Sequence, residues 1–436
     1  MLQRRIQTLL LLRPALKILY ISQYFPPEIG APAARVSELS RYWVQAGHEV
    51  TVLTGFPNHP DGVVRPEYRK HFCRGIFRER VQGVEVVRTV LLPFPNRKAY
   101  ERMLNYSSFC VSAALAGSFL GRPDVVIATS PQLLVGLSGW WVSKIKKVPF
   151  VLEIRDLWPE SLSAVGVGSD NSLLHRTLAR LARFLYNVAD HIVVVTPAFR
   201  RRLIENWQVP PEKISVIQNG VETNLFKPQT PDPALRATLN ADGKFVVSYI
   251  GTLGLAHGLE TLIAAAEKLQ PMAPQVLFLL VGEGAERERI TALAKSKKLN
   301  NIRFVPQQSR EKIPAYISTS DACLVLLKKS DVFETVIPTK MLEFMSCGRP
   351  VVLGVNGEAH RILENSRSGI HIAPEDPDAL CGAVLQLSQH PLMCEAFGRN
   401  GREYIVENLS RKHTSVGYLE VLRGLLQSEV QFMAAA

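Results

Sequence analysis

The sequence repeats one local pattern in both halves: an apolar strand, a turn that contains glycine, and a helix. The first half starts this pattern at residues 17–22, KILYIS, and the second half starts it again at residues 245–269, FVVSYIGTLGLAHGLETLIAAAEKL. Strands that alternate with helices form parallel sheets covered by helices. Two runs of the pattern therefore predict an α/β chain with two Rossmann-like, doubly wound domains that face each other across a cleft.

The length of 436 residues fits two domains, and the 47% of apolar residues can fill two large cores. The expected division is an extension at residues 1–16, an N-terminal domain at 17–220, a linker at 221–243, a C-terminal domain at 244–410 and a final helix at 411–436. We expect that final helix to pack back on the N-terminal domain. The apolar run in the extension is too short for a signal sequence, and no stretch reaches the length of a transmembrane helix.

The net charge of +12 comes from one half of the chain. Residues 1–220 hold 28 of the 51 basic residues and 16 of the 39 acidic residues, so the rest of the chain is balanced. A basic half favours an acidic surface, either anionic lipid or nucleic acid, but it also fits a soluble face without a partner. A helix expected over residues 95–120 joins an apolar stretch to Arg97, Lys98 and Arg102. This helix fits a membrane surface or the interior of the first domain, and we favour burial for its C-terminal half.

A charged helix start in the second half is a candidate anion site. Pro338 fits the first position of a helix, and Gly348 fits its C-terminal cap. Lys340 stands in the first helical turn, where a cation opposes the helix dipole. A phosphate bound at the helix start would remove this conflict, and Glu343 one turn later could accept hydrogen bonds from a ribose. The alternative is a plain Lys–Glu pair on a solvated helix.

Three loops of the first half carry candidate binding residues. Gly30 follows the first strand, where its missing Cβ either lets a ligand approach the backbone or simply permits a turn. Asn58 and His59 follow the second strand and could contact a polar substrate. Arg155 and Asp156 follow a central buried strand, where their charges indicate either catalysis and ligand binding or a structural ion pair.

These motifs together resemble a known family. IGTL at 250–253, LLVGEG at 279–284, NIRFVP at 301–306 and PTKMLEFMSCGRPVV at 338–352 are similar to the nucleotide-sugar glycosyltransferases of family 4. YFPPEIGAPAARVSEL at 24–39 and EIRDLWPES at 153–161 resemble the subgroup that builds bacterial surface polysaccharides, including fucosamine and other amino-sugar transferases. The resemblance implies a GT-B fold and a retaining, metal-independent sugar transfer from a nucleoside diphosphate sugar.

The resemblance also implies roles for individual residues. Glu343 matches the second of two motif glutamates, which holds the ribose in relatives, while the first falls on Thr335 with Glu334 beside it. Basic residues of the family's glycine loop fall on Thr252 and His257, which leaves Lys340 as the diphosphate cation. The implied donor-binding residues are Gly30, Gly251, Thr252, His257, Glu334, Thr335, Val336, Ile337, Lys340 and Glu343. The implied catalytic residues are Arg155, Asp156 and Lys340, and Asn58 and His59 are the acceptor candidates.

The family implies a donor, an acceptor and a place of action. The donor is a nucleotide sugar, no further cofactor is expected, and the acceptor is a glycan hydroxyl, with a polyprenyl-linked glycan expected. The six cysteines read as reduced thiols, which indicates a cytoplasmic protein. Because the expected acceptor is linked to a lipid, we expect the enzyme on the inner face of the cytoplasmic membrane. A nucleotide-sugar epimerase of the same fold and a basic non-enzymatic binding protein are the alternatives, although no nucleic-acid motif is present.

No metal is expected in the site. The sequence Asp376-Pro377-Asp378 has the D-x-D spacing of metal-dependent glycosyltransferases. It directly precedes an apolar-periodic helix, so an N-cap followed by proline at the first helical position explains it better.

Overall fold

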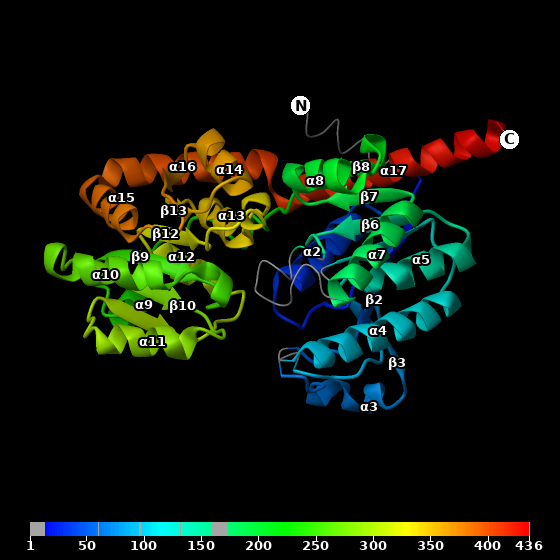
Figure 1. Ribbon diagram of the computed structural model, residues 1–436, viewed down its shortest axis with the longest axis horizontal. Helices are drawn as coiled ribbons and strands as arrows, with labels where there is room; N and C mark the ends of the chain where they lie inside the picture. The colour runs from blue at the N-terminus through cyan, green and yellow to red at the C-terminus, as the bar shows by residue number, and fades with distance from the viewer. Residues whose placement is uncertain are drawn as a thin grey trace. The chain divides into compact units, whose positions relative to one another are not determined.

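The computed structural model describes residues 14–59, 61–95, 98–130, 132–158, 160 and 173–435. The chain divides into two compact units, each of which contains a sheet and helices (Figure 1). The first unit comprises Met1–Gln218 together with Thr414–Ala436, and the second comprises Asn219–His413.

The first unit contains an eight-stranded sheet in the order β3-β4-β2-β1-β5-β6-β7-β8. Its strands are β1 Lys17–Ile21, β2 Glu49–Gly55, β3 Ile76–Val81, β4 Val84–Thr89, β5 Val125–Thr129, β6 Phe150–Ile154, β7 His191–Val194 and β8 Ile214–Val216. Every neighbouring pair is parallel except β3 and β4. The strand order reverses between β1 and β5, and open α/β sheets bind ligands beside such a reversal, at the carboxyl ends of the strands.

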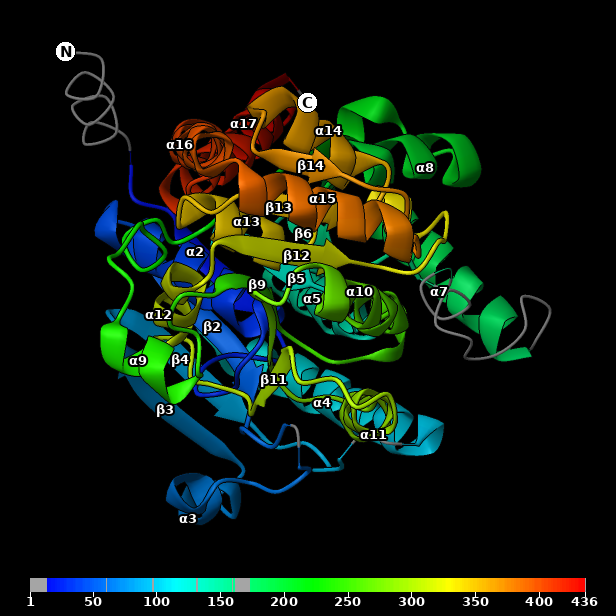
Figure 2. The same ribbon diagram turned by 90° about the vertical axis from the view of Figure 1, so that its left-hand side faces the viewer.

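Helices connect these strands, as Figure 2 shows from a second direction. They are α2 Ala31–Gln45, α3 Arg69–Phe72, α4 Ala99–Phe119, α5 Val135–Lys146, α7 Leu173–Val188 and α8 Pro197–Trp207, with short 3₁₀ turns η1 Pro66–Tyr68 and η2 Pro211–Lys213. The last helix, α17 Arg411–Ala435, returns to this unit. Trp43 donates from Nε1 to the Ser415 carbonyl at 3.1 Å, and the ring of Tyr418 packs edge-on against Trp43.

The second unit contains a parallel six-stranded sheet in the order β11-β10-β9-β12-β13-β14. Its strands are β9 Phe245–Ile250, β10 Val276–Val281, β11 Ile302–Val305, β12 Ala322–Leu326, β13 Val351–Gly354 and β14 Gly369–His371. Its helices are α9 Pro233–Thr238, α10 Glu260–Met272, α11 Arg287–Ser296, α12 Ile313–Thr319, α13 Thr339–Ser346, α14 Glu358–Ser366, α15 Pro377–Gln389 and α16 Pro391–Asn408, with 3₁₀ turns η3 Leu255–His257 and η4 Phe333–Thr335. Here the strand order reverses between β9 and β12.

Both faces of this second sheet are buried, which explains its nearly continuous apolar strands. Along β9, Val246 and Ile250 contribute to one core cluster, whereas Val247 and Tyr249 contribute to the other. Successive strand residues point to opposite faces, so each strand feeds two cores at once.

One expectation from the sequence needs correction. Residues 221–243, expected as a linker, pack into the second unit, because Phe226 and Ala241 are completely buried in its core and α9 lies between them. The segment at residues 63–80 contains η1, α3 and most of β3. Its alternating exposed and half-buried residues suit an edge strand, which offers little apolar signal.

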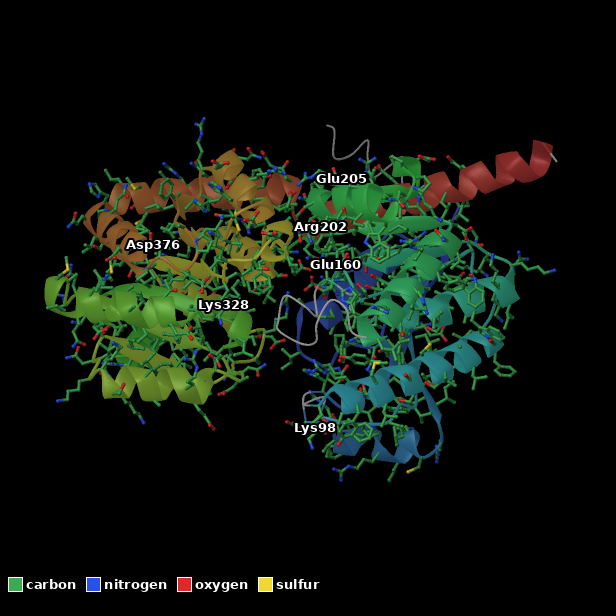
Figure 3. The ribbon with its side chains drawn as sticks, in the orientation of Figure 1. Lys98, Glu160, Arg202, Glu205, Lys328 and Asp376 are labelled. Atoms are coloured by element: carbon green, nitrogen blue, oxygen red, sulfur yellow. The ribbon has the colours of Figure 1, made fainter. Side chains whose placement is uncertain are left out.

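Asp376 caps α15, as predicted (Figure 3). Its Oδ1 accepts hydrogen bonds from the backbone N–H groups of Asp378 and Ala379, and Pro377 occupies the first helical turn. The Asp378 carboxylate pairs with Lys268. Among the residues described, no group of three or more His, Cys, Asp or Glu side chains could hold a metal ion.

Candidate functional site

The helix start predicted to bind an anion lies in the second unit. Pro338 is the N-cap of α13, and Gly348 follows the helix with a φ of 70°. The stretch between β12 and α13 leaves the sheet where the strand order reverses, so Lys340 begins its helix beside the loop that follows β9. The topology therefore places the α13 N-terminus where an α/β sheet offers a ligand site.

The Lys340 ammonium is held in an aromatic and glycine-lined setting. It lies 4.0 Å from the centre of the Tyr249 ring and donates from Nζ to the Tyr249 hydroxyl at 2.7 Å. The same hydroxyl donates to the Thr252 carbonyl at 2.8 Å, so Tyr249 links Lys340 to the loop after β9. Burial of the ammonium lowers the pKa of Lys340 to about 7, although the residue as a whole keeps intermediate exposure.

Gly251 makes room for this lysine. Its φ of 141° is one that side chains rarely adopt, and a Cβ there would lie 3.0 Å from Lys340 Nζ. A larger residue would be strained and would also displace the ammonium. The predicted pair of Gly251 and Lys340 is therefore brought together by the fold.

The remaining residues of the glycine loop are neutral. Thr252 is exposed, and His257 lies in η3 with its Nδ1 at 3.3 Å from the Gly254 carbonyl. Burial, together with the nearby Lys340, lowers the pKa of His257 to about 3, so its ring carries no charge near neutral pH. Lys340 is thus the cation that this loop surrounds.

Sequence reasoning missed a second cation near this loop, Lys328. It lies two residues after the end of β12. Its backbone N–H donates to the Ala256 carbonyl at 2.9 Å, which joins the two loops at the strand reversal. The only sequence signal was a basic pair after an apolar strand. Figure 3 labels Lys328.

Glu343 forms an ion pair with Arg310, and not the simple pair with Lys340 that a solvated helix would favour. Its Oε1 pairs with Arg310 Nη1 at 3.1 Å, and only 13% of its side chain is exposed. Arg310 also lies over the Phe226 ring, 5.0 Å from its centre. The carboxylate is therefore oriented from outside α13, and sequence reasoning had no signal for Arg310 because it comes from a separate loop.

The four residues predicted before α13 differ in how far their side chains are buried. Val336 and Ile337 pack against the second unit's core, and Thr335 is buried with its hydroxyl donating to the Val332 carbonyl at 2.6 Å. Glu334 keeps intermediate exposure, and its carboxylate accepts a long hydrogen bond of 3.5 Å from Asn356. Glu334 is thus the charged member of this group, and its side chain stays partly accessible, whereas Thr335 is buried.

In the first unit, the predicted residues lie along the carboxyl edge of the sheet. Gly30 is the exposed N-cap of α2, with a φ of 149°. The Asn58 side chain is buried, and it donates to the Phe56 carbonyl at 3.0 Å, so this amide holds its own loop. His59 is exposed and packs edge-on against Tyr24, with ring centres 5.5 Å apart.

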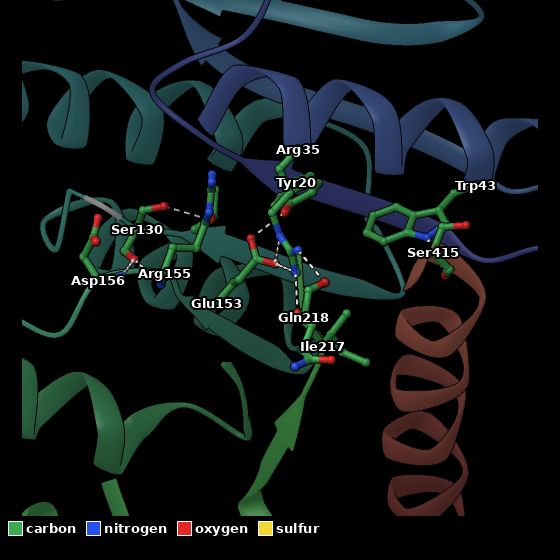
Figure 4. Close-up of polar contacts among 11 residues, drawn as sticks. Tyr20, Arg35, Trp43, Ser130, Glu153, Arg155, Asp156, Ile217, Gln218 and Ser415 are labelled. Carbon is green, nitrogen blue, oxygen red and sulfur yellow. Dashed lines mark hydrogen bonds and ion pairs between the residues drawn. The ribbon is translucent and has the colours of Figure 1, made fainter. Parts of the chain in front are cut away.

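Arg155 and Asp156 follow β6 in an environment that disfavours charge (Figure 4). The Ser130 hydroxyl accepts from both of their backbone N–H groups, at 2.7 and 3.4 Å. Burial, together with the nearby charge of Arg35, lowers the pKa of Arg155 to about 10, whereas burial raises the pKa of Asp156 to about 6. Among the residues that the structure describes, no hydrogen-bond partner is found for Nε and Nη1 of Arg155.

A buried ion pair fixes α2 to the centre of the same sheet (Figure 4). Arg35 and Glu153 are both inaccessible to solvent and lie 2.8 Å apart. Glu153 also accepts from the Tyr20 hydroxyl at 2.6 Å, and Arg35 donates to the Ile217 carbonyl at 3.1 Å. Burial opposes ionisation of Glu153, yet the Arg35 guanidinium keeps the pKa of this carboxyl below its usual value. Glu153, two residues before Arg155, therefore has a structural partner in Arg35.

The two units match two known protein families. Residues 30–220 match the family described as glycosyl transferase 4-like domain, and residues 232–404 match glycosyl transferases group 1. Among curated proteins, the putative colanic acid biosynthesis glycosyl transferase WcaI of Escherichia coli K12 is 25% identical over 421 residues, which cover 94% of this chain and 100% of WcaI. The probable glycosyltransferase WbjE of Pseudomonas aeruginosa is 23% identical over 307 residues, which cover 70% of this chain and 73% of WbjE.

Solved structures share the fold. Sucrose-phosphate synthase from Thermosynechococcus elongatus superposes with a TM-score of 0.74 at 22% identity, covering 96% of this chain and 99% of its own. Anabaena Alr3699/HepE, in a complex with UDP, superposes with a TM-score of 0.69 at 18% identity, covering 94% of this chain and 100% of its own.

Proposed function

Because the chain belongs to the glycosyltransferases that combine a glycosyl transferase 4-like domain with a group 1 domain in a GT-B fold, we propose that it builds bacterial surface polysaccharide. It would transfer a sugar from a nucleoside diphosphate sugar to a glycan hydroxyl. The name of WcaI, a putative colanic acid biosynthesis glycosyl transferase, supports this role, and the UDP bound to HepE supports a nucleotide donor.

One observation carries the proposal: the buried ammonium of Lys340 beside Gly251 at the start of α13. As the bond from the sugar to the diphosphate breaks, negative charge builds on the leaving diphosphate. A fixed cation and free backbone N–H groups at a helix start stabilise that charge more in the transition state than in the ground state. Glu343 would hold the ribose hydroxyls, and Glu334 would face the donor sugar.

We further propose a retaining transfer that needs no metal. Lys340 and the α13 N-terminus would supply the charge stabilisation that a divalent cation supplies elsewhere. In this reading the leaving phosphate itself takes the proton of the acceptor hydroxyl. A lipid-linked glycan, held on a polyprenyl diphosphate, would provide that hydroxyl.

A transfer assay with EDTA present tests this proposal. The full chain is incubated with a panel of UDP-, GDP- and dTDP-sugars and a mixture of lipid-linked glycans, and products are followed by mass spectrometry. We expect an acceptor extended by one sugar, with the anomeric configuration of the donor kept. Loss of turnover in EDTA with rescue by Mg²⁺ or Mn²⁺ would contradict metal independence, and a changed donor without an acceptor would indicate an epimerase.

An apolar surface with basic flanks supports a membrane partner. We name it the α4–α5 face, and it consists of Leu104, Val111, Leu115, Phe119, Trp141 and Ile145, all of them exposed. The two helices are in contact, since Trp141 Nε1 donates to the Ser118 hydroxyl at 3.3 Å. The prediction that the C-terminal half of α4 is buried is correct for one side of the helix only. Phe109 and Ala113 face the core, whereas Val111, Leu115 and Phe119 face outward.

Exposed cations lie at both ends of the α4–α5 face. Lys98 precedes α4, where Figure 3 labels it, and Arg122, Lys144 and Lys147 lie near the other end. Arg97, another of the three predicted cations, lies outside the described residues. Within the described ranges, no helix is long and apolar enough to cross a membrane. We therefore propose peripheral attachment to the inner face of the cytoplasmic membrane.

Charge reversal of Lys98 and Arg102 should release the chain from anionic vesicles. Each cation near the surface contributes roughly 1 kcal/mol toward anionic lipid, and salt screens this attraction. Co-sedimentation should therefore rise with the anionic lipid fraction, fall in high salt, and fall again when Leu115 and Phe119 become aspartate. Charge reversal of the exposed Lys297 in the second unit serves as the control. Equal recovery in the supernatant with neutral and anionic vesicles would refute peripheral attachment.

A further inference from the structure

Glu28 is a buried carboxylate for which none of the roles above accounts. It lies in the loop between β1 and α2, only 5% exposed. Its Oε1 accepts hydrogen bonds from the backbone N–H groups of Asn58 and His59, at 3.1 and 3.0 Å. One oxygen of the carboxylate is thus anchored between two loops at the carboxyl edge of the first sheet.

The second oxygen is less completely bonded. The Phe25 backbone N–H also lowers the pKa of the Glu28 carboxyl, but among the described residues no donor reaches Oε2 with the distance and angle of an ordinary hydrogen bond, and Oε2 is not fully enclosed. Arg88, the cation that acts on Glu28, forms its own ion pair with Glu79 at 2.5 Å. A buried carboxylate with one incompletely bonded oxygen is costly unless a donor completes it, so the position is suited to a hydrogen-bonding ligand.

The surroundings favour a hydroxyl-bearing ligand over an ion. Tyr24 lies within hydrogen-bonding range of Tyr106 and Gln132, and Asn105 donates to the Leu92 carbonyl nearby at 2.7 Å. These groups are neutral, aromatic or amide, and they gather where the strand order reverses between β1 and β5. A carboxylate would repel a phosphate, and the described residues supply no acidic cluster for a cation. Aromatic faces with a few convergent polar groups are the usual lining of a small-molecule site.

We propose that Glu28 Oε2 accepts a hydrogen bond from a hydroxyl group of the acceptor sugar. This inference rests on the proposed glycosyl transfer. It also changes the roles of the predicted acceptor pair, because Asn58 and His59 then act through their backbone N–H groups by orienting Glu28.

The substitution Glu28→Gln tests Oε2 alone. Glutamine keeps one oxygen for the two backbone N–H groups, but it puts an N–H₂ group where Oε2 accepts. The probe is a panel of octyl glycosides of hexoses, N-acetylhexosamines and deoxyhexoses, with binding followed by calorimetry. We expect the variant to bind these glycosides at least about tenfold more weakly than the wild type does, because a charge-assisted hydrogen bond is lost. Affinity for a nucleoside diphosphate should stay unchanged.

A pH series identifies the group that acts. Burial raises the pKa of Glu28 to about 7, against the opposing effect of its backbone hydrogen bonds and of Arg88. The other titratable groups that face it are Tyr24, whose pKa is raised by burial, and His59, whose pKa is lowered by burial. Wild-type glycoside affinity should fall as the pH falls through about 7, because the carboxylate then gains a proton, and Glu28→Gln should abolish this dependence.

Glu49→Gln is the matched control, since Glu49 lies at the opposite end of β2 in an exposed pair with Lys17. It should behave as the wild type. Unchanged glycoside affinity in Glu28→Gln, the same pH dependence in both proteins, or no glycoside binding by the wild type would each overturn the inference. Failure of the proposed function would appear separately, as no binding of any nucleotide sugar.

Discussion

Replacing Lys340 with methionine should lower kcat/KM for the nucleotide sugar by about 100- to 1000-fold, the range for removing one preorganised donor from a developing anion. Methionine keeps much of the apolar stem that packs beside Tyr249, but it removes the ammonium that lies next to Gly251. Binding of the nucleoside diphosphate should weaken by about 1.5–3 kcal/mol, the value of a charge-assisted hydrogen bond. Lys268→Met, which removes an exposed cation from α10, is the control.

The affinity for the nucleotide sugar should also depend on pH in a defined direction. Burial lowers the pKa of Lys340 to about 7, so the free protein loses the binding cation as the pH rises through that value. Nucleotide-sugar affinity should then fall with rising pH, by at most about tenfold per pH unit, because binding must take up one proton. Calorimetry in buffers of different ionisation enthalpy measures that uptake. A Lys340→Met protein with wild-type affinity and the same pH profile would show that Lys340 does not bind the diphosphate.

Replacing Glu153 with glutamine should destabilise the first unit by about 3–5 kcal/mol, because it leaves the Arg35 guanidinium buried without its counter-charge. Both side chains are fully inaccessible in the structure, so water cannot screen the remaining charge. The Tyr20 hydroxyl, which donates to Glu153, would lose a charged acceptor as well.

Tryptophan fluorescence makes this measurement specific to the first unit, since all five tryptophans of the chain lie within residues 1–218. Urea unfolding followed at this signal should shift strongly for Glu153→Gln. The control is Glu85→Gln, which breaks the exposed pair with Arg78 in the same sheet and should cost less than about 1 kcal/mol. Equal shifts for the two variants would mean that the buried pair contributes no more than a surface pair.

The local pattern was sufficient to predict the strands and helices near the proposed donor site. Pro338 and Gly348 bracket α13 because the backbone requirements of helix ends are properties of single residues. The role of Asp376 as an N-cap was predictable for the same reason, because an N-cap bonds only to the backbone of the residues that follow it directly. The expected α/β architecture of two doubly wound units, with the GT-B fold, is confirmed.

Contacts between distant segments were not predictable. Tyr249 reads as one more core residue of β9, yet it holds Lys340 from a position 91 residues away. Arg310, from the loop before α12, likewise pairs with Glu343 of α13. Glu28 stands in an ordinary proline-containing turn, and only the fold brings the Asn58 and His59 N–H groups to it. Local sequence patterns do not predict such pairs, because the folding of distant segments into one sheet brings the partners together.

Hydrogen exchange of the full chain with and without a saturating nucleotide sugar tests the central claim most directly. If the second unit binds the donor between the loop after β9 and the start of α13, protection should appear in peptides covering residues 251–258 and 334–343. The Lys340→Met protein should lose most of this protection at the same ligand concentration. Protection confined to other segments, with these two unchanged while the ligand is bound, would contradict the account.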